Sequence, residues 1–284
     1  ELEASLPAHY PPADGSASIE NRRQTNLDKD FNEWLSKQEA AVIEWSVLRP
    51  SEMQTNLPRL EILDDGSIYS TGDITKRDIF TLTFALNSQD VPVQALRLEA
   101  LPDERLPAGG PGRCYYEGRK GDFFLSEVDA SVAGEDVEII SASHSYGKIG
   151  IGSGTADALN VLDGDGSTGW STSSREGRAS RLVLNFAKPL ATSGELILTL
   201  LFERHFAASL GRFRISAARP ADAMATDLPD EVASLLLKDR SSWSPKQFEI
   251  VRSHFLRVAP KLKEARKPID DLRAKMPNEP TALV

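Results

Sequence analysis

The sequence predicts a mainly β protein: an antiparallel β-sandwich or jelly roll with an N-terminal helix and a C-terminal helical segment. At least eight segments between residues 58 and 218 alternate apolar with polar residues, as strands with one buried face do. The connections between them are rich in glycine and proline. No helical periodicity lies between these segments, which disfavours a parallel α/β sheet. We therefore expect three segments, namely 1–50, 51–220 and 221–284.

The first segment is polar and ends in an amphipathic helix. From Asn26 onward, apolar residues recur at three- and four-residue steps, as on one face of a helix. Asn26 is a suitable N-cap residue for this helix. We expect its Phe31, Leu35 and Trp45 face to pack on the sandwich or on the C-terminal helices.

The central segment supplies the strands. A hairpin is predicted at Asp65-Gly66, a common turn pair. Charged residues alternate with apolar ones on two later strands, which predicts that they lie on a solvent-exposed sheet face. These charged residues are Arg97, Glu99, Arg212 and Arg214.

The last segment is helical again. Pro229 and Pro245 stand where proline is tolerated, in the first turn of a helix, and Ser244 is a good cap before the second. Pro268 predicts a kink or a break in the charged stretch 261–275.

Composition narrows the function classes. The net charge is −9, from 33 basic and 42 acidic residues, and this disfavours a nucleic-acid partner. No stretch approaches the roughly 20 apolar residues of a membrane span. The only cysteine is Cys114, so an internal disulfide is excluded, and without a CxxCH motif the chain carries no haem. The chain begins without methionine, and we expect it to be a fragment of a larger protein.

No pattern singles out a catalytic site. His144 and His205 lack an obvious nucleophile, and the stretch 147–154 lacks the order of a phosphate-binding loop. A non-catalytic binding module, an architectural spacer and an enzyme with an unrecognised site remain open. Aromatic residues in or near loops could pack internally or stack on sugars. They are Tyr115, Tyr116, Tyr146, Phe206 and Trp243.

The stretch LDGDGSTGW, residues 162–170, is rich in oxygen-bearing side chains and ends in a tryptophan. An EF-hand is excluded, because counting from Asp163 places Thr168 at the position that requires glycine. Two interpretations remain: a loop in which Asp163, Asp165 and Thr168 bind Ca²⁺, or an Asp-Gly turn held by hydrogen bonds alone. In the first, Trp170 is a buried anchor.

The same stretch, followed by RLVLNFAKPL, resembles the start of discoidin-type domains. That resemblance implies a jelly-roll sandwich, binding of carbohydrate or lipid head groups, and a structural calcium completed by a glutamate from a strand. FFLSEV resembles the closing strand of such a domain, yet it precedes the loop. The resemblance therefore implies a circularly permuted sandwich, with Glu127 as the additional calcium ligand.

A wider set of motifs, including WSVLRP, DDGSIYSTGD, GPGR and LGRFRIS, resembles a segment of large planctomycete surface proteins that are often associated with cytochrome c domains. This implies a piece of an exported, multidomain protein, in the periplasm or at the cell surface, with a carbohydrate-binding role. The alternative is a spacer that positions neighbouring cytochrome or enzymatic domains.

Overall fold

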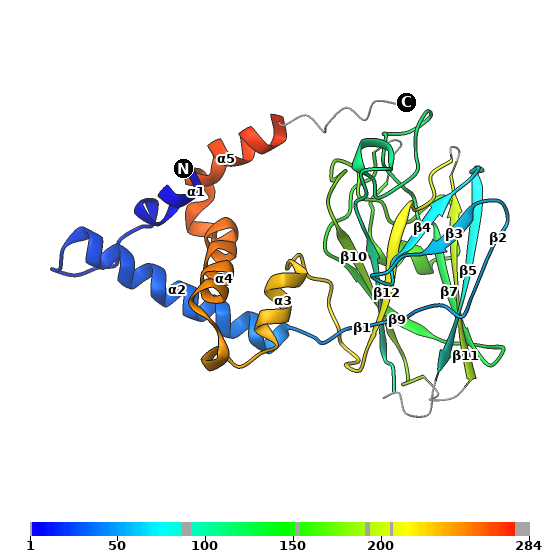
Figure 1. The fold of residues 1–284 in the computed structure, drawn as a ribbon, viewed down its shortest axis with the longest axis horizontal. Helices are drawn as coiled ribbons and strands as arrows, with labels where there is room; N and C mark the ends of the chain where they lie inside the picture. Colours follow the sequence, from blue (N-terminus) through cyan, green and yellow to red (C-terminus); the bar gives the residue numbers. More distant parts are fainter. Residues whose placement is uncertain (1, 87–91, 151–153, 191–193, 205–206, 276–284) are drawn as a thin grey trace. The chain divides into compact units, whose positions relative to one another are not determined.

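The computed structural model describes residues 2–86, 92–150, 154–190, 194–204 and 207–275 (Figure 1). The chain divides into two compact units. The helical unit combines Glu1–Glu44 with Leu228–Pro277, and the sandwich unit spans Trp45–Asp227. The helices near both ends of the chain thus belong to one unit.

The described part of the sandwich unit contains two antiparallel sheets (Figure 1). The larger has the order β3-β4-β12-β6-β10-β9, with β1 paired to β12, and the smaller has the order β2-β5-β11-β7-β8. The larger sheet consists of β1 (Ser46–Val47), β3 (Arg59–Ile62), β4 (Ile68–Thr71), β6 (Ala95–Ala100), β9 (Ile139–His144), β10 (Ser180–Phe186) and β12 (Arg212–Ala218). The smaller consists of β2 (Glu52–Thr55), β5 (Arg77–Leu86), β7 (Glu127–Val132), β8 (Glu135–Asp136) and β11 (Gly194–Glu203).

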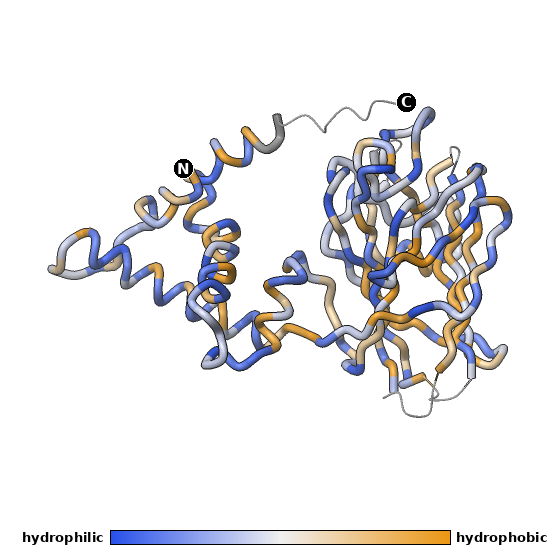
Figure 2. The backbone as a smooth tube through the Cα atoms, in the orientation of Figure 1, coloured by the Kyte–Doolittle hydropathy of each residue, from blue (hydrophilic) through white to orange (hydrophobic). Residues whose placement is uncertain are grey.

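One apolar core joins the two sheets. Alternate residues of β5 and β11 from the smaller sheet and of β6 and β12 from the larger sheet are buried in a single cluster. Figure 2 shows hydrophobic residues interspersed with hydrophilic ones along these strands. Burial of one face of each sheet against the other is the defining feature of a sandwich. The predicted antiparallel β-sandwich, including the hairpin between β3 and β4, is confirmed.

One end of the sandwich carries its longest connections. Strand register places the last residue of β6, Ala100, opposite the first residue of β10, Ser180, and the end of β9 beside them. The connections 101–126 and 145–179 therefore emerge at the same end. They include the short helices η2 (Pro107–Gly109) and η3 (Ala158–Leu162).

The prediction that the charged residues lie on a solvent-exposed sheet face is wrong for the middle of the larger sheet. Glu99 is fully buried, and its carboxylate lies 3.2 Å from Arg97, 3.5 Å from Arg181 and 2.7 Å from Arg214. A later stretch of the chain crosses this face, since Arg181 donates to the Thr226 carbonyl at 3.3 Å. Buried charge is tolerated there because it is paired.

The helical unit is built around α2, which differs from its prediction at both ends. Its elements are α1 (Leu2–Ser5), η1 (Leu6–His9), α2 (Ile19–Ala41), α3 (Asp230–Leu236), η4 (Arg240–Ser242), α4 (Pro245–Val258), η5 (Pro260–Leu262) and α5 (Lys263–Lys275). Ser18, not Asn26, caps α2 by accepting from Asn21 N–H at 3.2 Å. Trp45 follows the helix and belongs to the sandwich unit, where the Arg97 guanidinium lies 4.9 Å from its ring centre.

The predicted apolar face of α2 packs on the C-terminal helices. Phe31 and Leu35 are buried in a cluster with Val251 and Phe255 of α4. Ser244 caps α4 with a complete capping box, as predicted for this position. Pro268 lies within α5 and does not end it. None of the described helices has the length and apolar content needed to cross a membrane.

Candidate cation site at the loop-rich end of the sandwich

Two segments far apart in the sequence are joined at Leu125 and Trp170. Leu125 N–H donates to the Trp170 carbonyl at 2.9 Å, and Trp170 N–H donates back at 2.8 Å. Gly169 has to be small, because a Cβ there would overlap the Leu125 carbonyl. Continued in the antiparallel direction, this pairing brings Glu127 toward Thr168 on one side.

Trp170 fixes this junction to the core. Its side chain is fully buried, and its ring packs perpendicular to Phe123 with ring centres 5.0 Å apart. The indole N–H donates to the Tyr146 carbonyl at 2.9 Å, so the one polar atom of the side chain is satisfied. The prediction that Trp170 is a buried anchor is confirmed.

The loop before Trp170 brings Asp163 and Thr168 together. One Asp163 carboxylate oxygen accepts from Asp165 N–H at 2.9 Å, and the other accepts from the Thr168 hydroxyl at 2.7 Å. The same hydroxyl lies 3.0 Å from the Asp165 carbonyl and 3.5 Å from the Asn160 carbonyl. Carboxylate, hydroxyl and carbonyl oxygens thus gather within one short loop.

Asp165 contributes its backbone carbonyl oxygen to this cluster of oxygen atoms. Its side-chain carboxylate accepts from the Ser167 hydroxyl at 2.7 Å and from Ser167 N–H at 3.0 Å. These hydrogen bonds hold the pKa of the Asp165 carboxyl below its usual value. The carboxylate therefore belongs to an Asx turn, and the Asp165 carbonyl is the oxygen directed at Thr168.

Glu127, the first residue of β7, meets the loop from the sheet. Burial, together with the negative charges of Asp163 and Asp129, raises the pKa of its carboxyl to about 7. The Gly164 N–H acts in the opposite direction. One buried Glu127 oxygen, Oε1, has no hydrogen-bond partner among the described residues. Two carboxylates therefore face each other, and one oxygen of the pair has no donor.

The available oxygens suit a hard cation. The described ranges contain no group of three or more His, Cys, Asp and Glu side chains suited to a metal, so hydroxyl and carbonyl oxygens would have to complete any shell. Ca²⁺ accepts such mixed oxygen sets in flexible geometry, whereas Mg²⁺ demands a near-ideal octahedron. Zinc prefers nitrogen and sulfur ligands. The residues present fit calcium.

A second acid, buried in the structure, lies on the other side of the junction. Asp122 is 5% exposed, and its Oδ1 accepts from the Ser171 hydroxyl and from Phe123 N–H, both at 2.9 Å. The Ser173 hydroxyl also bonds to this carboxylate. Burial is the main cause that raises the pKa of Asp122 to about 6. The sequence analysis missed this residue; its only signal was the run of hydroxyl residues from Ser171 to Ser173.

Three other candidates that the structure describes, His144, Tyr146 and Trp243, do not assemble into a site. His144 ends β9 and pairs with Leu182 along the strand. His205 and Phe206 lie outside the described residues. Tyr146 packs through a hydrogen bond from its hydroxyl to the Ser173 carbonyl at 3.0 Å. Trp243, in the helical unit, is likewise used in packing.

Two tyrosines remain on the surface. Tyr115 is 38% exposed and Tyr116 is 89% exposed, and their rings meet edge to face with centres 4.6 Å apart. Both belong to the long connection 101–126 at the loop-rich end.

Comparison with known proteins adds no further evidence. No protein-family model matches this sequence. No curated protein matches it either.

Proposed function

We propose that this chain is a non-catalytic binding module of an exported protein, and that it binds carbohydrate and holds a structural Ca²⁺. Asp163, Thr168, Asp165 and Glu127 would hold the ion. The observation that carries the calcium site is the Glu127 carboxylate, which faces Asp163 and has a buried oxygen with no donor in the part of the chain that the structure describes. A cation between two carboxylates removes their repulsion.

When bound, calcium would supply positive charge between the loop and the first residue of β7. Residues of the chain itself hold the loop in place: Trp170 anchors it to the core, and the hydrogen bond between Asp163 and Thr168 fixes its conformation. The proposed architecture is a circularly permuted, discoidin-like jelly roll, supported by the position of Glu127 before the loop in sequence. The ion would not contact the carbohydrate.

The exposed tyrosine pair supports carbohydrate as the ligand. Tyr115 and Tyr116 offer large apolar ring faces with polar tips, a combination that suits stacking on a sugar ring. Lys120 lies 5.0 Å from the centre of the Tyr115 ring and adds a hydrogen-bond donor beside it. A periplasmic or cell-surface location and covalently linked neighbouring domains belong to the same proposal.

Glycan-array binding by the whole chain tests this function. We expect selective glycan binding that the substitution Tyr116→Ala weakens at least tenfold. Because Tyr116 is almost fully exposed, the variant should keep the melting temperature of the parent protein. An array without any specific signal would count against the binding module.

A spacer between neighbouring domains is the second candidate function. The observation that favours it is the separate apolar core of the helical unit, formed by Leu27, Phe31, Val251 and Phe255 among others. Small-angle scattering of the full-length protein tests it. A spacer requires a fixed separation of the flanking domains, and a broad distribution of separations would count against it.

A further inference from the structure

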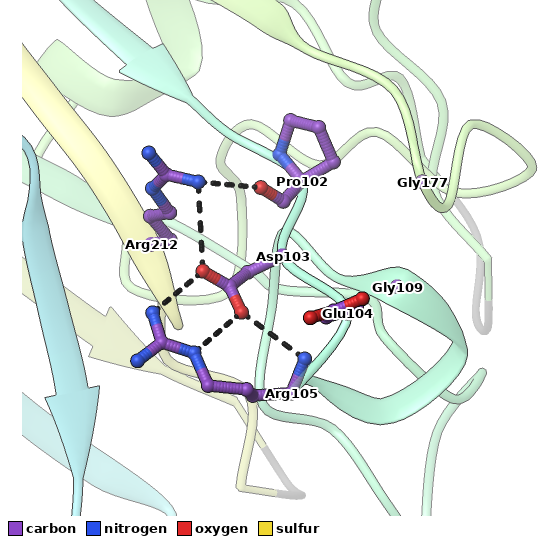
Figure 3. A pocket seen from close by; sticks show the side chains of 7 residues that line it. All are labelled: Pro102, Asp103, Glu104, Arg105, Gly109, Gly177 and Arg212. Carbon is purple, nitrogen blue, oxygen red and sulfur yellow. Dashed lines mark hydrogen bonds and ion pairs between the residues drawn. The ribbon is translucent and has the colours of Figure 1, made fainter. Parts of the chain in front are cut away.

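An open cavity of about 570 Å³, lined by several charged side chains, lies beside the larger sheet at the loop-rich end (Figure 3). It lies where β6 ends and β12 begins, so residues from three parts of the chain line it. The lining includes Asp103, Glu104, Arg105, Gly109, Gly177 and Arg212. Its size falls within the roughly 300–1,000 Å³ typical of small-ligand sites.

The floor of the cavity is a fixed charge network. Asp103 accepts two side-chain N–H bonds from Arg105, both at 2.8 Å, and the Asp103 side chain is only 6% exposed. Arg212 donates to the Pro102 carbonyl at 3.3 Å and approaches Asp103 at 3.5 Å. Figure 3 shows that Arg105 and Arg212 both contact Asp103, and that Arg212 also contacts Pro102. A ligand would meet groups that are already ordered, which lowers the entropic cost of binding.

Arg105 is held in place yet remains accessible. Its guanidinium lies 3.9 Å from the centre of the Tyr69 ring, and one edge is bound to Asp103. Half of its side chain is exposed. A planar guanidinium fixed in this way presents its remaining N–H groups in a defined direction.

Glu104 supplies a hydrogen-bond acceptor to the cavity, and its exposed carboxylate lies on the Gly109 side (Figure 3). The walls there are glycines: Gly109 and Gly177 have φ of +78° and +73°. A Cβ on Gly109 would lie 3.3 Å from the Gly177 Cα, a tight contact, so a side chain at position 109 would crowd the approach of the two loops.

We propose that this cavity binds one sugar residue of a neutral glycan, through vicinal hydroxyls that accept from Arg105 and donate to Glu104. The proposal rests on the carbohydrate-binding function above; the tyrosine pair does not line this cavity and would contact another sugar residue of the same glycan. Two lining arginines are balanced by two lining carboxylates, so neither an anion nor a cation is favoured by net charge. Sugar hydroxyls both donate and accept, and therefore match an exposed donor beside an exposed acceptor.

Ligand-observed NMR and calorimetry on the whole chain test the assignment. The probes are the methyl glycosides of glucose, galactose, mannose and N-acetylglucosamine, with glucuronate and glucosamine as charged counterparts. The variants are Glu104→Gln and Arg105→Ala, and Glu135→Gln, on the exposed strand β8, is the matched control. We expect a neutral glycoside to bind, at least tenfold weaker binding in both variants, and no change in the control.

Other results would overturn the proposal in distinguishable ways. Unchanged affinity in Glu104→Gln, an exposed position whose substitution leaves the fold intact, would remove the sugar from this cavity and leave the glycan-binding function standing. Binding of only glucuronate or only glucosamine would replace the neutral ligand by a charged one. Binding of none of the probes, together with a silent glycan array, would remove both the cavity assignment and the proposed function.

Discussion

Two acids, the buried Asp122 and the half-buried Glu127, lie on opposite sides of the Leu125–Trp170 junction and differ in what surrounds them. Burial raises the pKa of both, to about 6 and about 7 respectively. Asp122 accepts from hydroxyl and backbone donors. Glu127 accepts from the Gly164 N–H but faces a second carboxylate, and one of its buried oxygens has no donor among the described residues. Burial alone therefore does not indicate a cation site; an uncompensated pair of like charges does.

The strongest intervention removes the junction that both acids share. Replacing the fully buried Trp170 with alanine should cost about 4 kcal/mol of unfolding free energy, because a large cavity forms. Both carboxyl pKa values should also move toward their ordinary range as water enters. Urea unfolding and NMR titration measure these effects. Trp243→Ala, in the helical unit, is the control, and equal shifts of the two pKa values in that variant would contradict the shared-junction argument.

Calcium should act on one side of the junction only. An ion that binds the folded state alone stabilises it by about 2.7 kcal/mol at a hundredfold excess over Kd. Thermal unfolding with calcium and with chelator measures this gain, and Asp163→Ala should abolish it. Glu135→Gln, at an exposed position on β8, is the matched control. If the wild-type curves with calcium and with chelator coincide, the loop is a hydrogen-bonded turn.

Asp122 should govern a pH dependence that calcium leaves unchanged. Its pKa in the folded protein, about 6, lies above the ordinary 3.8, so the folded state holds the proton more tightly. The resulting stability is fully present below pH 4 and is lost as pH rises through 6, by about 2 kcal/mol. Asp122→Asn should flatten this part of the stability curve. If the free energy of unfolding of this variant, measured by chemical unfolding, changes as steeply between pH 4 and 7 as that of the wild type, the pH dependence belongs to another group.

The sequence predicted the sandwich because strand alternation reports directly on which side chains face the core. It also located Trp170, since a large apolar residue after an oxygen-rich loop has few other roles. It failed for Glu99, because alternation separates two faces but does not say what covers the outer one. The start of α2 was missed because residues 19–25 are mostly polar and lack the apolar periodicity used to find the helix.

The candidate site was predictable only in part. Asp163 and Thr168 lie five residues apart, so one loop could be seen to gather their oxygens. Glu127 entered through a resemblance, because nothing local to it indicates its neighbour. The Asp122–Ser171 bond joins residues 49 positions apart, and no single-sequence pattern records such a pairing.

The smallest effect separates the two acids most sharply. In chelator, Glu127→Gln should raise the free energy of unfolding above pH 7 by about 1 kcal/mol, after allowing for solvent screening. The reason is that the pKa of the wild-type carboxyl rises from its ordinary 4.5 to about 7 on folding, and above that pH the ionised carboxylate repels Asp163. With calcium the sign should reverse, since the substitution removes a ligand and calcium binding requires the deprotonated carboxylate. Asp122→Asn has no such ligand to lose, so its effect should be the same with and without calcium. Melting temperatures of both variants at pH 7.5, with calcium and with chelator, measure the comparison. If Glu127→Gln changes the melting temperature in the same direction with calcium and with chelator, Glu127 resembles Asp122 and binds no cation.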